Sequence, residues 1–455
     1  MKQMKFLSVK FYFLFFILTL NLFSARLYAQ QYSVSGYITD ESNGETLINA
    51  SVLDRNSSNG KVSNVYGFYS IRLQKGEVNL QYSYVSYLSK NIRFNLTKDT
   101  IINIQLGSNT TLQEVTVIGN RNEIGVKGSQ MSAIEVPITQ IKTIPSLFGE
   151  TDVLKALQLL PGVQAGSEGS AGLYVRGGGP DENLLIFDGI PVYNVNHAMG
   201  LFSVFNPDAV KNVTLYKGSF PARFGERLSS VVDIRMKDGD DKNYHGTVSV
   251  GLISSKANIE GPIIKEKTTF NISFRRTYAD LLMQPVIKIM AKQNDLESAS
   301  AGYYFYDFNT KVTHKINDKN KLFLSVYSGD DGIYFGNKYK YDYGSDNETV
   351  NDKLNWKWGN FISALKWNRV LSGKLFMNVT AAYTQYRFNM KLNEELTSKS
   401  NKNESSSEME LGYKTGINDY STRLDFDYAP STKHDVKFGV SHTYHTFRPV
   451  LSHLI

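Results

Sequence analysis

The second half of the chain, from about residue 244 onward, alternates apolar and polar side chains over long stretches. In one stretch Leu375, Met377 and Val379 fall on one face, with polar residues such as Asn378 between them. Successive side chains of a β-strand point to opposite faces of the sheet. The pattern therefore predicts long strands with one apolar and one largely polar face.

The connections between these strands distinguish a membrane barrel from a soluble sandwich, which could show the same alternation. Short turns (NDKN, LSGK and STKHD) alternate with long polar stretches near residues 283–302, 337–357 and 391–416. Short turns at one rim and long loops at the other are typical of outer-membrane β-barrels. We therefore expect residues 241–455 to form the N-terminal part of such a barrel.

The number of strands falls short of a closed barrel. We count about nine strands after residue 240, or about 24 residues for each strand with its connection. A transporter barrel of about 22 strands would need about 520 residues at this spacing. Because an open edge in lipid leaves unpaired backbone groups, at several kcal/mol each, we expect the gene to continue beyond Ile455 by about 300 residues.

The N-terminus has the layout of a secretory signal peptide. Three lysines precede an apolar run at residues 11–23, and the small residue Ala29 follows. An inner-membrane anchor is the alternative, but a spanning helix needs about 20 apolar residues, and Asn21 and Arg26 interrupt this run. We expect residues 1–29 to be removed on export.

Residues 30–107 contain short alternating runs separated by Gly, Asn and Asp, which predict a small β-sandwich. The segments VSGYITDESNGETLINASV, NVYGFYSIRL and YSYVSYL resemble the carboxypeptidase regulatory-like (transthyretin-like) domain. This segment has no His and nothing that resembles a set of zinc ligands, so we expect no peptidase activity.

Residues 108–130 are rich in Gly, Ser and Asn, as expected of a flexible linker. Within it, residues 112–119 (LQEVTVIG) have the β-branched alternation of a strand but no neighbouring hairpin partner. An unpaired strand-forming segment in a linker is a candidate for pairing with a sheet edge of another protein. The alternative is a last strand that packs on the sandwich.

Residues 131–240 show a mixed α/β pattern. Thr151 is placed to cap a short helix, which Pro161 and Gly162 would end. Strand-like pieces follow at LYV, LLIFDGI, VTLYKG and VVDIRM. The pattern predicts a compact domain of about 100 residues.

This segment carries a second and more specific resemblance. The runs VLKALQLLPGVQAGSEGSAGLYVRGGGPDENLLIFDGIPVYN and FSVFNPDAVKNVTLYKGSFPARFGERLSSVVDIRM resemble the plug domain of TonB-dependent receptors, particularly those of the Bacteroidota type. SFRRTYADLL resembles a barrel segment that follows this plug. The fold class implied is multidomain and mainly β: a transthyretin-like β-sandwich, a mixed α/β plug and a partial antiparallel transmembrane β-barrel.

Several motifs could be mistaken for catalytic or binding sites. Arg176, Gly177, Gly178 and Gly179 could suggest a phosphate loop, but no Lys-Ser/Thr pair follows and the next element has a strand pattern. The plug resemblance assigns them to a tight turn. His442 and His445 lie three apart, on opposite faces of a strand, so they do not converge on a metal.

Three carboxylates near this turn could suggest acid–base chemistry, but no His or nucleophile lies at a recognisable spacing from them. We interpret them as solvated turn carboxylates: Asp181, Glu182 and Asp188. The chain has no Cys, which excludes a thiol nucleophile and a Cys-ligated metal. Its net charge of +7 is scattered, so we expect no nucleic-acid binding. We expect no enzyme activity and no cofactor.

The plug resemblance implies a receptor in the outer membrane that takes up a scarce ligand with energy supplied through TonB, and keeps its N-terminal domain in the periplasm. It places the TonB box at Glu114, Val115, Thr116 and Val117. The partners implied are TonB, outer-membrane lipid and a small ligand (siderophore, glycan, cobalamin or peptide), with a surface lipoprotein as a further candidate. The ligand and its contact residues stay open. The alternative is a surface adhesin or interaction protein without transport.

Overall fold

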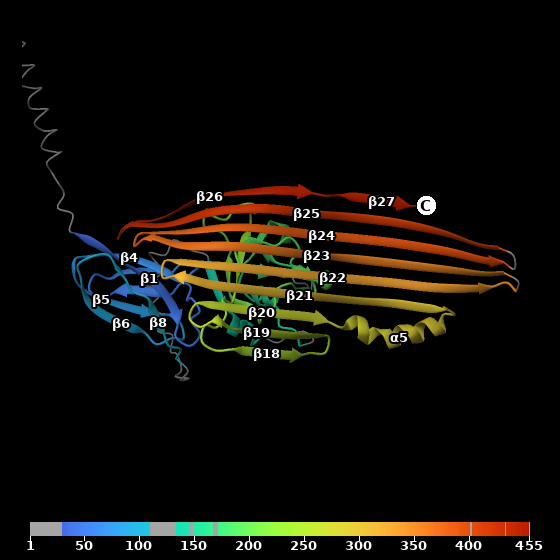
Figure 1. The fold of residues 1–455 in the computed structure, drawn as a ribbon, viewed down its shortest axis with the longest axis horizontal. Coiled ribbons are helices and arrows are strands. Elements are labelled where there is room, and N and C mark those ends of the chain that lie inside the picture. Colours follow the sequence, from blue (N-terminus) through green and yellow to red (C-terminus); the bar gives the residue numbers. More distant parts are fainter. Residues whose placement is uncertain are drawn as a thin grey trace, which may run out of the picture.

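The computed structural model describes residues 30–109, 133–144, 149–166, 172–344, 346–400, 403–432 and 434–454. Three units follow one another along the chain: a β-sandwich, a mixed α/β middle domain and a broad antiparallel sheet (Figure 1). Among the described residues, no helix has both the length and the apolar character to cross a membrane. The expected export signal and residues 114–117 lie outside the described residues.

The sandwich is made of two facing sheets. One has the order β4-β1-β7, with β8 also paired to β1, and the other has the order β3-β2-β5-β6. The apolar positions of the alternating runs, among them Val34, Ile38 and Leu80, are buried in the core between the sheets. The strands are β1 (Gln31–Asp40), β2 (Ser51–Asp54), β3 (Asn59–Val62), β4 (Phe68–Gln74), β5 (Gly76–Ser83), β6 (Lys90–Leu96), β7 (Thr100–Ile101) and β8 (Ile104–Leu106).

The middle domain is built on a five-stranded mixed sheet of order β13-β12-β17-β16-β9. Short helices and further two-residue strands surround this sheet. The elements are β9 (Ala133–Pro137), α3 (Ile138–Ile141), α4 (Val153–Gln158), β10 (Val163–Gln164), β11 (Tyr174–Val175), η1 (Pro180–Glu182), β12 (Asn183–Phe187), β13 (Ile190–Pro191), β14 (Asn196–His197), η2 (Ala198–Gly200), β15 (Phe202–Ser203), β16 (Val210–Tyr216) and β17 (Ser230–Met236).

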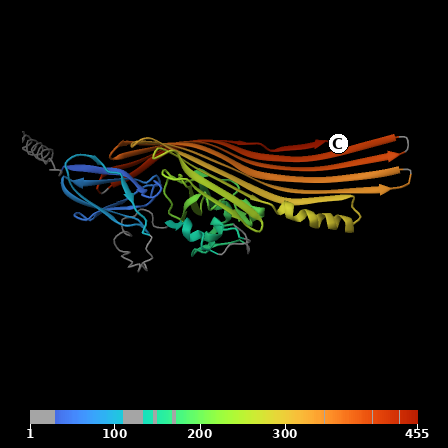
Figure 2. The ribbon, with the colours of Figure 1, turned by 60° about the horizontal axis from the view of Figure 1, so that its bottom comes forward.

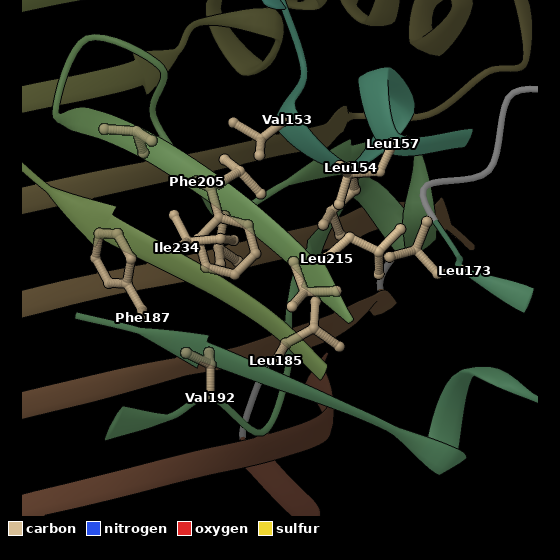
Figure 3. Close-up of a cluster of buried hydrophobic side chains, with 14 of the residues drawn as sticks. Val153, Leu154, Leu157, Leu173, Leu185, Phe187, Val192, Phe205, Leu215 and Ile234 are labelled. Carbon is tan, nitrogen blue, oxygen red and sulfur yellow. The ribbon is translucent and has the colours of Figure 1, made fainter. Parts of the chain in front are cut away.

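Helix α4 packs its apolar side on this sheet, where Leu154, Leu157, Phe205, Leu215 and Ile234 form a common core (Figure 3). The helix is where the sequence predicts it, but the predicted cap was wrong. The side chain of the next residue, Asp152, accepts the hydrogen bond from the backbone N–H of Lys155 at 3.0 Å.

The third unit is a ten-stranded antiparallel sheet, here called the wall (Figures 1 and 2). Its strands follow chain order, and β27 pairs with β25 beyond the end of β26. The elements are β18 (His245–Val250), β19 (Ser254–Ile264), β20 (Thr268–Thr277), α5 (Ala279–Gln293), β21 (Ser298–Asn317), β22 (Asn320–Asp342), β23 (Asp346–Ser372), β24 (Leu375–Ser400), β25 (Asn403–Ser431), β26 (His434–Phe447) and β27 (Val450–Leu454).

The strands of the wall confirm the predicted short turns and show that the predicted long loops were wrong. Strands end and restart at NDKN, LSGK and STKHD, as predicted. The stretches near 337–357 and 391–416, expected to be loops, are instead mostly strand: β22 ends at Asp342 and β23 begins at Asp346, and β24 ends at Ser400 and β25 begins at Asn403. The stretch near 283–302 is largely helix α5. Polar residues extend these strands because the hairpin ladders continue beyond the apolar band, so polarity alone did not mark the strand ends.

Candidate functional site

The wall has an apolar outer face and a polar inner face over the part that lies beside the middle domain. On the outer face large apolar side chains are exposed, including Phe274, Leu365 and Val440. On the inner face polar side chains are buried against the middle domain, including Asn309 and Asn368. This is the opposite of a soluble protein, in which an exposed apolar surface of this extent is unusual.

Past one row of paired residues, on the side away from the sandwich, the outer face becomes charged and the inner face becomes aromatic. The row runs through Asp330, Gly359 and Arg387, which are direct neighbours on β22, β23 and β24. Farther from the sandwich, the outer positions carry ion pairs such as Lys391 with Glu410, at 2.8 Å. Charged groups therefore border the apolar band on the outer face.

The inner face past the same row is lined by aromatic side chains. The rings of Trp356 and Trp358 are 5.1 Å apart, and Phe388 lies 5.8 Å from Trp356. Tyr413 continues the group at 5.9 Å from Phe388. Strand alternation places all four on the face that also contacts the middle domain. The far end of the wall thus presents an aromatic surface next to that domain.

Asp188 fastens the middle domain to the wall through two lysines. It follows β12 with φ of 46°, an uncommon conformation for a residue other than Gly. Its carboxylate lies 3.1 Å from Nζ of Lys311 and 2.6 Å from Nζ of Lys366, and it accepts a hydrogen bond from Ser325. Burial opposes its ionisation, but the two ammonium groups outweigh burial and hold the pKa of Asp188 well below its usual range.

This finding corrects the prediction that Asp181, Glu182 and Asp188 are all solvated. Asp181 is exposed and Glu182 is half-buried, where it accepts a hydrogen bond from the N–H of Gly179 at 3.1 Å, whereas Asp188 is 2% exposed. The lysines that bind it lie 123 and 178 residues further along the chain. No local pattern could show that they would meet.

His197 forms a second buried link between the middle domain and the wall. Its Nδ1 lies 2.7 Å from Asp331 and its Nε2 2.8 Å from Asp307, while its ring stacks on Phe305 with centroids 4.1 Å apart. Burial disfavours the charged ring, but the two carboxylates outweigh burial and raise the pKa of His197 to about 9. Arg275 pairs with the same Asp307 at 2.5 Å. Sequence reasoning missed His197 because its partners come from distant strands.

The segment with Arg176, Gly177, Gly178 and Gly179 forms a turn between β11 and η1. Arg176 and Gly177 both have φ of 62°, and the backbone N–H groups of Val175 and Gly178 donate to each other's carbonyls. A Cβ on Gly178 would collide with the side chain of Ser229. Arg176 donates to the carbonyl of Lys217 at 2.9 Å. The turn therefore serves the packing of this domain.

The sandwich docks against the short-turn end of the wall. The ring of Phe68 stacks on Phe376 with centroids 5.0 Å apart, and Tyr66 lies 5.7 Å from the same ring. Arg72 donates to the carbonyl of Pro430 at 2.5 Å, and Asn64 to Asp427 at 2.9 Å. The sandwich therefore covers the end of the inner face that is opposite the aromatic surface (Figure 1).

A mixed α/β domain held by buried ion pairs against the polar face of an outwardly apolar wall defines a plugged β-barrel architecture. Two family models match the chain: the CarboxypepD_reg-like domain at residues 34–117 and the TonB-dependent Receptor Plug Domain at residues 131–232. The chain therefore contains a carboxypeptidase regulatory-like domain and a TonB-dependent receptor plug domain, which confirms both resemblances.

The chain is similar to proteins named as TonB-dependent receptors and to the solved structure of a siderophore receptor. The chain is 29% identical over 221 residues to TonB-dependent receptor P26 of Formosa agariphila, covering 45% of this chain and 21% of that receptor. It is 26% identical over 256 residues to TonB-dependent receptor SusC of Bacteroides thetaiotaomicron, covering 51% and 24%. The siderophore receptor PirA from Acinetobacter baumannii overlaps 66% of this chain and 59% of its own at 12% identity, with a TM-score of 0.35. The matches thus span about a quarter or less of the curated relatives' length.

Proposed function

We propose that this chain belongs to an outer-membrane receptor that takes up a scarce ligand with energy supplied through TonB. The wall would cross the membrane, and the plug domain would close its interior. The sandwich would lie on the periplasmic side, where TonB is reached. No chemistry would be performed on the ligand.

The inverted polarity of the wall carries this proposal. On β24 the outer apolar positions extend over residues 375–383, which is nine residues, and a tilted strand needs about 9–11 residues to cross a membrane. Outside this band the outer face carries the ion pair of Arg387 with Asp330, at 2.7 Å. Charges are costly in the hydrocarbon layer and favourable at its edge. A lipid-facing band bordered by charge supports a membrane position for the wall.

The aromatic surface supports ligand capture at the far end of the wall. Trp356, Trp358, Phe388 and Tyr413 lie on the inner face, past the row of paired residues and away from the sandwich. Aromatic rings bind flat or partly apolar ligand groups at a low entropic cost. Siderophores, glycans, cobalamin and peptides all present such groups, so the ligand class stays open. A surface lipoprotein would be a further partner at this end.

We assign the TonB box to Glu114, Val115, Thr116 and Val117, which lie outside the described residues. The segment sits between the last strand of the sandwich, β8, and the first strand of the plug, β9. A tethered strand-forming segment can add to a sheet edge of TonB through main-chain hydrogen bonds. Pulling on this segment would act on the plug through β9, which pairs with β16 in the plug sheet.

Val115→Pro tests the assignment, because proline lacks the N–H that strand addition requires. We expect the receptor, expressed from the whole gene, to keep its normal abundance in the outer membrane. Co-purification with the C-terminal domain of TonB should fall at least about tenfold, which corresponds to about 1.4 kcal/mol, or roughly one strong hydrogen bond.

Val126→Pro provides the matched control, since it makes the same change elsewhere in the linker. It should leave TonB binding unchanged. If residues 112–119 were instead the last strand of the sandwich, Val115→Pro would lower receptor abundance. Normal TonB binding by Val115→Pro at normal abundance would refute the box.

A further inference from the structure

A cavity lies where the sandwich, the plug domain and the wall meet. It encloses about 520 Å³ of space not occupied by atoms, part of which is open to solvent. The part of it that the centre of a water molecule can reach is about 40 Å³, and about 10–15 Å³ by this measure holds one water molecule. Its walls come from Val65 and Tyr66 of the sandwich, Gly189 of the plug domain and the inner face of strands β23, β24 and β25. There is room for a few water molecules or for one small ion.

The cavity is lined by more positive than negative side chains. Four cations face it, two from the plug domain and two from the wall, against the two carboxylates of Asp425 and Asp427. The cations are Arg223, Arg235, Lys366 and Arg423. A surplus of cations in a recess with low-dielectric walls concentrates anions.

The four cations differ in how close a carboxylate lies to them. Lys366 is paired with Asp188 at 2.6 Å, and Arg235 with Asp233 at 2.7 Å. Arg423 has a more distant carboxylate, Asp425, at 3.5 Å. Within the described part of the chain, no carboxylate oxygen lies within 4.0 Å of Arg223. Arg223 and Arg423 are therefore the least neutralised of the four cations.

Some of the guanidinium N–H groups around this cavity have no hydrogen-bond partner in the protein. The buried Nε–H groups of Arg223, Arg235 and Arg423 have no hydrogen-bond partner among the described residues. Buried polar groups in proteins are nearly always paired, so the Nε–H groups of Arg223 and Arg235 are unusual, while that of Arg423 faces Asp425 at 3.5 Å. An oxyanion would accept from such guanidinium groups with suitable geometry.

Gly189 shows how closely three of the cations approach one another. A Cβ built on this glycine would lie 3.6 Å from Nη1 of Arg235, 3.7 Å from Nζ of Lys366 and 3.8 Å from Nη2 of Arg423. Arg423 donates to the carbonyl of Gly189 at 2.6 Å and Lys366 donates to Asp188, so these groups converge on the backbone here, and the absence of a side chain at Gly189 leaves space beside them. Lys366 is 3% exposed, so this point is well shielded from bulk water.

The sandwich covers the cavity from its own side. Tyr66 lines it, and Phe68, two residues further on, is stacked on Phe376, which also borders the cavity. Asn64 donates to Asp427 at the same edge. Movement of residues 64–68 would therefore open the cavity.

We propose that this cavity binds a small oxyanion of the phosphate or carboxylate kind, and that the tip of the sandwich at residues 64–68 is its cover. The site is distinct from the aromatic surface at the far end of the wall. It lies on the sandwich side of the plug, so a bound anion would bridge the plug domain, the wall and the cover. Its occupancy would favour the docked position of the sandwich.

A single introduced thiol can probe this cavity, because the chain has no Cys. Thr380→Cys places a thiol of similar size among its lining residues. The receptor, expressed from the whole gene with any other cysteine changed to serine, is reacted with two methanethiosulfonates, one bearing a sulfonate and one a trimethylammonium group. We expect the anionic reagent to react at least about tenfold faster than the cationic one. Inorganic phosphate should slow the anionic reagent.

Arg423→Gln in this background should abolish the preference for the anionic reagent and the effect of phosphate, with Arg223→Gln as a second variant if the first does not fold. Arg93→Gln, at an exposed position of the sandwich, is the matched control and should change neither. Tyr66→Ala should speed both reagents by the same factor. Equal rates for the two reagents, or rates unaffected by phosphate, would overturn the anion site, and unchanged rates in Tyr66→Ala would overturn the cover. None of these outcomes depends on uptake or TonB.

Discussion

Replacing Asp188 with Asn should lower the free energy of unfolding of the plug domain by about 3–5 kcal/mol, the cost of breaking a buried ion pair on one side. The change keeps the shape of the side chain and removes its charge. Lys366 would lose the carboxylate that lies 2.6 Å from its Nζ. Of its two carboxylate partners, Lys311 would keep Asp238, at 2.8 Å. Both ammonium groups would stay buried with too little negative charge around them.

Hydrogen exchange of the receptor, expressed from the whole gene, can measure this loss at strands β12 and β17, which pair in the plug sheet. Asp181→Asn is the matched control, since Asp181 is an exposed carboxylate of the same domain. It should change the free energy of opening by no more than about 0.5 kcal/mol. A loss below about 1 kcal/mol for Asp188→Asn would mean that these ion pairs do not hold the plug.

The attachment of the plug should also weaken as the pH rises through the pKa of His197. The two carboxylates of Asp307 and Asp331 raise this pKa from 6.5 to about 9. A group whose folded pKa is raised stabilises the fold fully below its unfolded pKa and loses that contribution as the pH passes its folded pKa. The stabilisation is therefore complete below pH 6.5 and is lost as the pH rises through about 9. A shift of this size corresponds to stabilisation on the order of 3 kcal/mol.

His197→Gln isolates this effect, because glutamine cannot take up the proton. The difference in unfolding free energy between the native and variant receptors should be largest near pH 6 and should shrink by about 3 kcal/mol as the pH rises past 9. Taking the difference removes titrations that the two proteins share. His442→Gln, an exposed histidine on β26, should show no such trend. A difference independent of pH between 6 and 9.5 would contradict the role assigned to His197.

Much of the fold follows from local sequence patterns. Period-two alternation gave the strands of the sandwich and the wall, and it placed Met377 and Val379 on the outer face and Asn378 on the inner one. Proline and glycine correctly marked the end of helix α4. The strand lengths were not predictable in this way. Residues 337–342 and 391–400 are polar yet remain in strands, because their ladders are set by pairing with neighbouring strands.

The links between plug and wall could not be predicted from local sequence. Asp188 resembled the turn carboxylates that precede it in the sequence, and His197 belonged to no motif. Their burial results from lysines and aspartates that lie more than a hundred residues away in sequence. These groups come within hydrogen-bonding distance only when the wall strands pair with one another and pack against the plug. The assignment of the TonB box rests on the sequence alone, because its residues lie outside those that the structure describes.

The most direct test of the account is the position of the wall in the membrane. Two single cysteines are introduced, Gly344→Cys at the far hairpin between β22 and β23 and Lys319→Cys at the short turn between β21 and β22, both exposed positions. Intact cells expressing the whole gene are treated with a thiol reagent that does not cross the outer membrane. We predict labelling of Gly344→Cys in intact cells, and of Lys319→Cys only after the outer membrane is permeabilised. Equal labelling of both positions in intact cells would contradict a wall that spans the outer membrane.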